Sequence, residues 1–227
     1  MGVNGSLLEF RGLTREYKRG GRTFNAVDGV SLSVEKGDFI SVIGRSGSGK
    51  STLLNMGAGL ITPTAGNVIF EGTDIYQLND GGISLFRNEK IGYVPQGQSL
   101  LSNFTVLENI CIPWFLYRRK GNPSERALTL LEKTGIANLA DSYPKELSGG
   151  EMRRAAIIRS LINNPALLIA DEPTNDLDAR TTAEVMKLLG DIAREGTAVL
   201  IVTHELDTLS YGNKTYEMNS GRLSLHP

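Results

Sequence analysis

Residues 39–54, with the sequence FISVIGRSGSGKSTLL, constrain the fold of this chain more than any other stretch. The apolar run 39–43 predicts a buried strand, and it breaks into three closely spaced glycines before Lys50. Glycines let backbone N–H groups converge on an anion, because no Cβ stands in the way. The helix that follows adds its unpaired N–H groups and the positive end of its dipole. The stretch therefore predicts a strand, a phosphate-binding loop and a helix.

The spacing within this loop fits the phosphates of a nucleoside triphosphate. Four residues separate Gly44 from Gly49, and Lys50 and Ser51 follow directly. In this pattern the lysine reaches the β- and γ-phosphates, and the serine hydroxyl can ligate Mg²⁺. A flexible glycine turn would explain the glycines but not the Lys-Ser pair before an apolar helix. The predicted phosphate-binding residues are Gly44, Arg45, Ser46, Gly47, Ser48, Gly49, Lys50, Ser51 and Thr52.

Composition narrows the function further. Lys plus Arg number 24 against 25 for Asp plus Glu, so no global positive field argues for a nucleic-acid partner. The single cysteine, Cys111, cannot form an internal disulfide, and we expect a reducing, cytosolic setting with Cys111 as a packing residue. The sequence has no apolar run of about eighteen residues, so membrane contact is expected only through a partner. We expect residues 1–227 to form one α/β domain.

Short apolar runs near the N-terminus predict a second, partly antiparallel sheet. These runs are residues 7–10, 30–34 and 68–70, and we expect this part of the chain to grip the base of the nucleotide. Tyr17 is expected on a loop, where a purine can stack on its ring. Covering a sheet edge is an equally good interpretation of Tyr17, and Phe24 is a competing aromatic.

Polar residues follow two further buried-strand runs. Asp171 and Glu172 come directly after residues 166–170, and His204 follows residues 198–203. In parallel α/β sheets ligands bind at the carboxyl ends of strands, so three strand ends are expected to point at one site. Asp171 can hold a water of the Mg²⁺ shell, and Glu172 can orient an attacking water. His204 can contact the γ-phosphate, the alternative being a hydrogen-bonded core histidine.

The middle of the chain predicts a loop and a helical insertion. A strand at residues 91–94 ends in Pro95-Gln96-Gly97, which leaves Gln96 at the mouth of a loop. Helical spacing at 105–116 and 123–134 predicts an insertion between about residues 99 and 147. We further expect a core or subunit-contact role for Trp114, Phe115 and Tyr117, and an edge hairpin from residues 215–218 and 222–225.

The segment LSGGE, residues 147–151, has two interpretations. Ser148 and Glu151 have the spacing of a capping box at the start of an apolar helix. That account leaves Gly149 and Gly150 unexplained, because each glycine costs a helix about 1 kcal/mol. The glycines make sense if another backbone or a phosphate approaches the helix end closely.

Together these motifs resemble the nucleotide-binding subunits of ABC transporters across almost the whole chain. The phosphate loop, Gln96, LSGGE, the LLIADEP strand, a loop with Asp178 and His204 occur in that family's order. The resemblance implies a P-loop NTPase of the ABC ATPase type, with a mainly parallel sheet core, an N-terminal antiparallel β subdomain and a helical insertion. It also implies that two copies sandwich two ATP molecules with Mg²⁺, each LSGGE segment capping the γ-phosphate on the other copy. The implied roles are catalysis by Glu172, His204 and Lys50, metal ligation by Ser51, Gln96 and Asp171, and nucleotide contacts from Tyr17, Gln96, Ser148, Gly149, Gly150 and Asp178.

Several longer sequence segments resemble one branch of that family. FRNEKIGYVPQ, NNPALLIADEPTNDLD and VTHEL are similar to cassettes of macrolide exporters, lipoprotein-release complexes and antimicrobial-peptide resistance transporters. This implies a separate integral membrane permease as partner and a peripheral place at the cytoplasmic face of the membrane. Pro95 and the Asn175-Asp176 pair depart from the residues that are usual in this branch. The alternative function is an ABC-type ATPase that regulates a cell-wall or other macromolecular process without transport.

Overall fold

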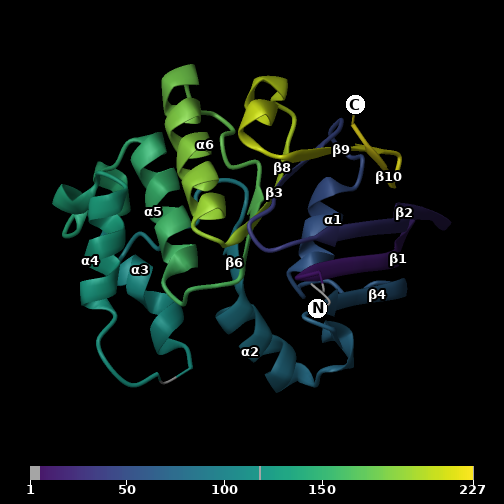
Figure 1. Ribbon diagram of the computed structural model, residues 1–227, viewed down its shortest axis with the longest axis horizontal. Helices are drawn as coiled ribbons and strands as arrows, with labels where there is room; N and C mark the ends of the chain where they lie inside the picture. The colour runs from purple at the N-terminus through teal and green to yellow at the C-terminus, as the bar shows by residue number, and fades with distance from the viewer. Residues whose placement is uncertain (1–5, 118, 227) are drawn as a thin grey trace, which may run out of the picture.

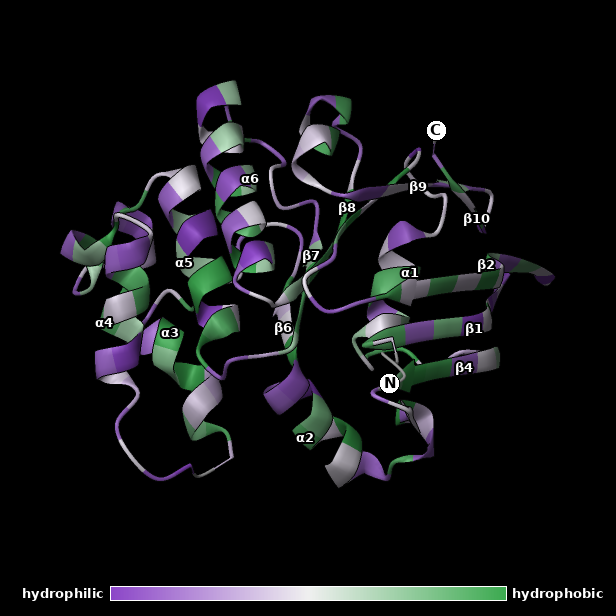
Figure 2. Ribbon diagram, in the orientation of Figure 1, coloured by the Kyte–Doolittle hydropathy of each residue, from purple (hydrophilic) through white to green (hydrophobic). Residues whose placement is uncertain are grey.

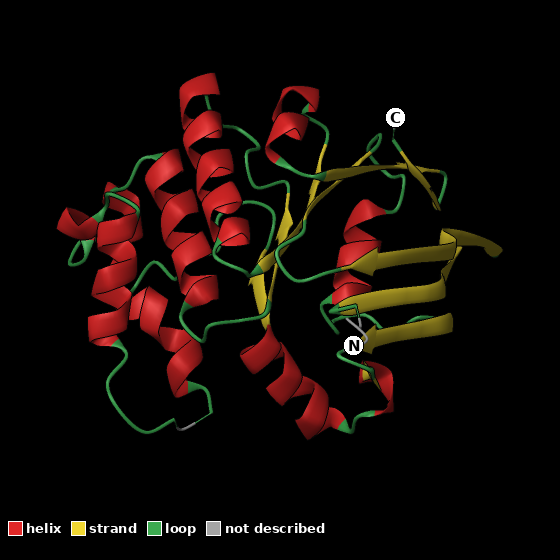
Figure 3. Cartoon of the chain, viewed as in Figure 1, coloured by secondary structure: helices red, strands yellow, loops and turns green. Residues whose placement is uncertain are grey.

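Two β-sheets and a group of helices make up the computed structural model, which describes residues 6–117 and 119–226. Helices α3 to α6 gather on one side of the central sheet, and α1 and the N-terminal sheet lie on the other (Figure 1, Figure 3). This is the architecture that the sequence predicts. The helices are α1 Lys50–Gly57, α2 Asp80–Lys90, α3 Val106–Phe115, α4 Ser124–Lys133, α5 Gly149–Leu161 and α6 Ala179–Arg194, with short 3-10 helices at Ile75–Gln77, Ala137–Leu139, Pro144–Glu146 and Leu206–Tyr211.

The N-terminal sheet is antiparallel and has the order β2-β1-β4-β5. Its first two strands are much longer than the apolar runs suggested, because they continue as a polar hairpin arm. Gly20 and Gly21 turn this hairpin, and both have the positive φ that tight two-residue hairpin turns need. The expectation that Tyr17 lies on a loop is therefore wrong, since Tyr17 is a strand residue paired with Phe24. The strands are β1 Leu8–Arg19, β2 Arg22–Val34, β4 Ala65–Phe70 and β5 Thr73–Asp74.

The central sheet has the order β10-β9-β3-β8-β7-β6. All neighbouring pairs from β9 to β6 are parallel, and β10 pairs antiparallel with β9 as the predicted edge hairpin. Every residue of β3, β7 and β8 is buried, as expected of parallel strands that are covered on both faces. Their apolar character is visible in Figure 2. The strands are β3 Phe39–Ile43, β6 Ile91–Val94, β7 Leu167–Asp171, β8 Ala198–Thr203, β9 Lys214–Asn219 and β10 Arg222–Leu225.

Helix α5 is apolar on two faces and joins two parts of the core. Ala156 and Ile157 pack in the cluster between the central sheet and α6. Ala155 and Ile158 pack in a separate cluster with α3 and α4, which also holds the buried Cys111. The predicted packing role of Cys111 is confirmed. Helix α5 therefore connects the helical region to the central sheet.

Helices α2 and α6 were not predicted from the sequence. Helix α2 has no fully buried residue, and two glycines stand in its first turn, so neither burial nor propensity marks it. Helix α6 has a regular buried face against the sheet, formed by Val185, Met186 and Leu189. Its start follows a run of mostly polar residues, 174–178, that carries no helical pattern.

The aromatic segment after α3 lies partly outside the core. Phe115 is 59% exposed and Leu116 is 67% exposed, and Tyr117 is also exposed. A core role is therefore wrong for Phe115 and Tyr117, and a contact with another chain remains a prediction. Trp114 is partly buried, and the Arg119 guanidinium lies over its ring at 5.5 Å from the centroid.

Candidate functional site

The phosphate loop joins β3 to α1, and close backbone packing shapes it. Gly49, the N-cap residue of α1, has a φ of 108°, and a Cβ there would clash with the Ala26 carbonyl oxygen. A Cβ on Gly44 would likewise clash with the carbonyl oxygen of Met218 on β9. Only glycine fits these two positions, because neighbouring backbone fills the space that a side chain needs. The loop is thus clamped between β2 and β9.

Lys50 turns back over this loop. Its Nζ donates hydrogen bonds to the carbonyl oxygens of Gly44, at 2.7 Å, and Arg45, at 3.1 Å, and the residue is buried. Around it, Arg45, Ser46, Gly47 and Ser51 are exposed, whereas Ser48 is buried. The loop therefore presents a fixed cation beside accessible backbone at the start of a helix, which is the arrangement that binds phosphates.

The strand order brings the predicted site residues to one edge of the sheet. β3, β8, β7 and β6 are consecutive parallel neighbours, so their carboxyl ends lie side by side. The phosphate loop follows β3, His204 follows β8, Asp171 and Glu172 end or follow β7, and Gln96 follows β6. Adjacent strands are about 4.8 Å apart, so these groups form one continuous row.

Asp171 has the environment of a metal-binding carboxylate. It is buried, and its Oδ1 has no hydrogen-bond partner among the described residues. Burial raises the pKa of Asp171, against the opposing effects of the Ser51 hydroxyl and the Lys50 charge. The described residues contain no cluster of three or more His, Cys, Asp or Glu side chains that could hold a metal. One carboxylate and one hydroxyl fit Mg²⁺, which usually keeps several waters and binds substrate phosphates.

Glu172 and His204 form a close pair at this edge. His204 Nδ1 and Glu172 Oε2 are 2.7 Å apart, and the Glu172 side chain is 13% exposed. The His204 side chain is 57% exposed, so the alternative of a core histidine is wrong. Glu172 has a φ of 50°, a left-handed conformation that is costly for a residue with a Cβ. Such strain is held in place only where the surrounding structure fixes it, often at functional sites.

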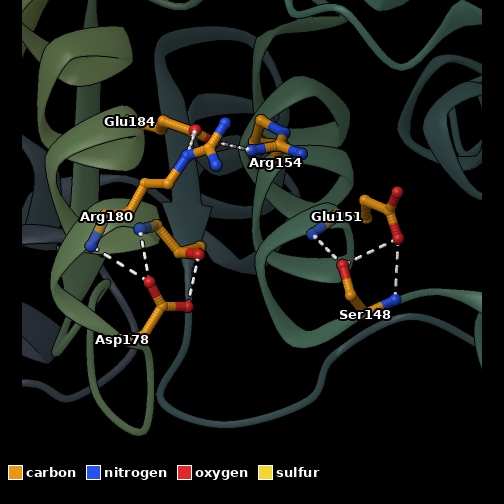
Figure 4. Close-up of polar contacts among 7 residues, drawn as sticks. Ser148, Glu151, Arg154, Asp178, Arg180 and Glu184 are labelled. Carbon is orange, nitrogen blue, oxygen red and sulfur yellow. Dashed lines mark hydrogen bonds and ion pairs between the residues drawn. The ribbon is translucent and has the colours of Figure 1, made fainter.

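The LSGGE segment begins α5, and its capping box is confirmed. The Ser148 Oγ donates to Glu151 Oε2 at 2.7 Å, and the Ser148 N–H donates to the same carboxylate at 2.8 Å (Figure 4). These two bonds, the side-chain one foremost, hold the pKa of Glu151 below its usual range. Ser148 and Gly149 are exposed, whereas Gly150 is buried. The helix start therefore presents its hydroxyl and first amides to the surface.

Gly150 has a reason within the chain that sequence reasoning missed. A Cβ at Gly150 would clash with the Cγ2 atom of Thr181 on α6, whereas a Cβ at Gly149 would make ordinary contact with Leu177. The expectation that both glycines serve an approaching backbone or phosphate is thus incomplete. The close approach of α5 and α6 explains Gly150, and Gly149 remains open to the predicted ligand role.

The structure places Asp178 beside LSGGE rather than among the phosphate-loop residues. Asp178 caps α6, accepting from the backbone N–H groups of Arg180 and Thr181 and from the Thr181 hydroxyl. A network of Arg154, Glu184 and Arg180 continues along the two helices (Figure 4). The loop before α6 and the start of α5 thus form one connected surface.

Two arginines of α5, one buried and one partly buried, were also missed. Arg159 donates to the Ser99 carbonyl oxygen at 2.6 Å and to the Ser99 hydroxyl at 2.9 Å. Arg153 is buried and donates to the Pro95 carbonyl oxygen at 3.4 Å. These three bonds hold the loop that carries Gln96 against α5. Arg153, Arg154 and Arg159 follow LSGGE in the sequence, but their spacing does not indicate which of them turns inward.

Comparisons with known proteins agree with this geometry. The sequence profile of the ABC transporter family matches residues 27–175. MJ0796, a bacterial ABC transporter cassette solved as a dimer, superposes with a TM-score of 0.88 at 34% identity over 96% of each chain. A dimeric post-hydrolysis state of MJ0796 bound to ADP and Pi gives 0.85 at 33% identity, also over 96% of each chain. CbiO1 from Clostridium perfringens, part of the cbiONQ complex, gives 0.85 at 30% identity over 97% of this chain and 87% of that one.

The chain therefore belongs to the ABC transporter family. It is an ATP-binding cassette, the ATPase of such a system, and cassettes of this kind bind ATP with Mg²⁺. Within residues 6–117 and 119–226, no helix has the length and apolar character needed to cross a membrane.

The contact between α5 and α6 yields a stability prediction. Gly150→Ala should lower the free energy of unfolding by about 1–3 kcal/mol, because the new methyl group overpacks against Thr181. Gly149→Ala is the matched control and should change it by less than about 1 kcal/mol. Adding Thr181→Ser to Gly150→Ala removes the obstructing methyl group but keeps the bond to Asp178, and should restore part of the loss. Thermal unfolding without nucleotide measures all four proteins, and a fully stable Gly150→Ala would contradict the packing argument.

Proposed function

We propose that two copies of this chain sandwich two ATP molecules and drive a separate membrane permease of the export, lipoprotein-release or antimicrobial-peptide resistance branch. The observation that carries the ATPase chemistry is the row of groups at the carboxyl ends of β3, β8, β7 and β6. It places Lys50, Asp171 and the Glu172–His204 pair along one edge. The assignment to this branch is supported only by the similarity of sequence segments.

In this proposal each group in the row has one task. Lys50 and the loop amides neutralise the phosphates, while Ser51, Asp171 and Gln96 hold the Mg²⁺ ion, which would shield the charge of the transferred phosphoryl group. Glu172 accepts a proton from the attacking water. The His204 contact at 2.7 Å orients the Glu172 carboxylate and can respond to the loss of the γ-phosphate.

The position of LSGGE supports a shared site. Two strands separate β3 from β6, so the phosphate loop and the loop with Gln96 start roughly 14 Å apart. Gly149, next to Ser148, lines a cavity of about 220 Å³ together with residues 97–100 of that second loop, and no phosphate-loop residue lines it. A phosphate on the loop is thus remote from Ser148 of the same copy. A second copy can bring its own Ser148 to it, and the MJ0796 structures are dimers.

A groove between α2, α3 and α5 supports the permease contact. It has a volume of about 270 Å³, and its lining combines apolar and basic side chains. The exposed Phe115 stands next to it in the sequence, directly before Leu116. A cytosolic helix of a permease, apolar on one face, fits such a surface. The groove, named here the α2–α3–α5 groove, is lined in part by Arg87, Asn88, Pro113, Leu116, Tyr117 and Arg159.

The groove is connected to the nucleotide edge. Arg159, which lines it, is bonded twice to Ser99 in the loop that carries Gln96. We propose that the helical region, about residues 99–147, shifts with this loop when nucleotide binds and carries the permease helix with it. In this arrangement the cassette is peripheral, at the cytoplasmic face of the membrane.

Replacing Glu172 tests the catalytic assignment. Glu172→Gln should leave the Kd for ATP within about twofold, lower hydrolysis by at least about 100-fold and accumulate an ATP-bound dimer, because the amide cannot accept the proton. Glu205→Gln changes the neighbouring carboxylate, which accepts from the Thr174 hydroxyl, and should retain hydrolysis. Phosphate release and light scattering measure the two effects. Unchanged hydrolysis in Glu172→Gln would remove Glu172 from this role.

Mixing two inactive variants tests the shared site. Lys50→Ala lacks the phosphate-binding cation, and Ser148→Asp keeps a capping side chain but places a negative charge against the γ-phosphate. If sites are shared, a mixed dimer holds one doubly damaged site and one intact site. An equal mixture should then recover about a quarter of wild-type ATPase activity, since half of the dimers are mixed. Each variant alone is the control, and a mixture as inactive as both would contradict the sandwich.

The α2–α3–α5 groove can be tested with a matched pair of leucines. Leu116 and Leu225 are both 67% exposed, but only Leu116 lines the groove. Leu116→Asp should reduce co-purification with a membrane permease by about tenfold or more, because it places a charge in an apolar contact. Leu225→Asp should have no effect, and both variants should bind ATP normally. If Leu225→Asp reduces co-purification and Leu116→Asp does not, the permease contact lies outside the groove.

A further inference from the structure

The hairpin arm of β1 and β2 begins beside the phosphate loop. The register of the two strands skips Ala26, which forms a bulge between the pairs Arg15–Val27 and Glu16–Asn25. The carbonyl oxygen of this bulged residue packs directly against Gly49. Tyr17 pairs with Phe24, only two residues further along β2. The bulge therefore fixes the position of the aromatic pair relative to the phosphate loop.

Arg15 holds the Tyr17 ring from one side. Its guanidinium carbon lies 4.9 Å from the ring centroid, and its Nη1 donates to the Thr62 carbonyl oxygen at 2.8 Å. Thr62 belongs to the loop after α1, the helix that carries the phosphate loop. Residues two apart on a strand share a face, so Arg15 and Tyr17 can make this contact because both lie on β1. Arg15 thus ties the ring to the element that positions the phosphates.

The two aromatic residues are not equivalent. Their ring centroids are 6.1 Å apart with a tilt of 32°, and Phe24 is 49% exposed. Among the described residues no cation lies over Phe24 as Arg15 does over Tyr17. A ring whose position is already fixed loses less freedom when a planar ligand stacks on it. The fixed position of its ring makes Tyr17, and not Phe24, the better candidate for stacking on the base.

We propose that Arg15 is a positioning residue that makes Tyr17 a one-sided platform for the purine of ATP. The guanidinium covers one face of the ring, and the purine stacks on the other face. This inference rests on the proposed nucleotide contact of Tyr17 and adds the residue that fixes its geometry. Arg15 acts through Tyr17 and not on the phosphates.

The test compares a ligand that has a base with one that has none. Calorimetry gives the Kd of Mg²⁺-ATP and of Mg²⁺-tripolyphosphate for each variant. Arg15→Ala should weaken ATP binding by about threefold to tenfold, while tripolyphosphate binding stays within about twofold. Tyr17→Ala should weaken ATP by at least as much, and adding Arg15→Ala to it should have no further effect. Lys18→Ala removes the same charge from the arm and should change neither ligand.

Arg15→Gln separates the two contacts of Arg15, and thermal unfolding checks that each variant folds. Glutamine can still donate to the Thr62 carbonyl oxygen but carries no charge, so it should weaken ATP selectively as alanine does. If Arg15→Ala and Arg15→Gln weaken both ligands equally, or neither, while Tyr17→Ala weakens ATP alone, the positioning role is overturned and the Tyr17 contact stands. If Tyr17→Ala leaves the ratio of the two affinities unchanged, the base contact itself is wrong.

Discussion

Parallel pairing of β3, β8, β7 and β6 is the constraint on which the site depends. The four strands are held in a continuous register, so chemistry encoded at four distant places in the chain emerges along one edge. Parallel pairing needs crossover connections and burial on both faces, which the helices and the N-terminal sheet provide. The polar residues need only stand at the end of each buried run or in the loop that follows it. The positions of the strand ends therefore determine which groups meet at the site.

Helix α5 carries the second organising role. It packs on the central sheet with one face and on α3 and α4 with another, and Arg153 and Arg159 hold the loop after β6. Its exposed first turn carries Ser148 and Gly149. One helix thus joins the nucleotide edge, the LSGGE surface and the α2–α3–α5 groove. In our proposal this is the part that converts a change at the phosphates into movement at the permease.

Much of the fold and site could be predicted from the sequence, because the signals were local. The phosphate loop, the buried runs and the capping box of Ser148 are fixed by residues a few positions apart. The hairpin arm was missed because the residues around Tyr17 are polar and lack a strand pattern. The place of Arg15 over Tyr17 was missed with that arm, because it depends on both residues lying on β1. The packing of Gly150 on Thr181 was hidden for another reason, since helix contact alone brings these two residues together.

The glycine contact between α5 and α6 has a mechanical consequence. Helices that touch at Gly150, with Asp178 bonded to the same Thr181, leave little room for sliding. In the sandwich that we propose, α6 follows the strand end with Glu172, which would serve one nucleotide, while α5 starts with LSGGE, which would serve the other. Helices α5 and α6 of one copy then form a single rigid unit that reaches both nucleotide sites. A displacement at one nucleotide is then transmitted to the other, so the two binding affinities are expected to be coupled while each site keeps its own catalytic groups.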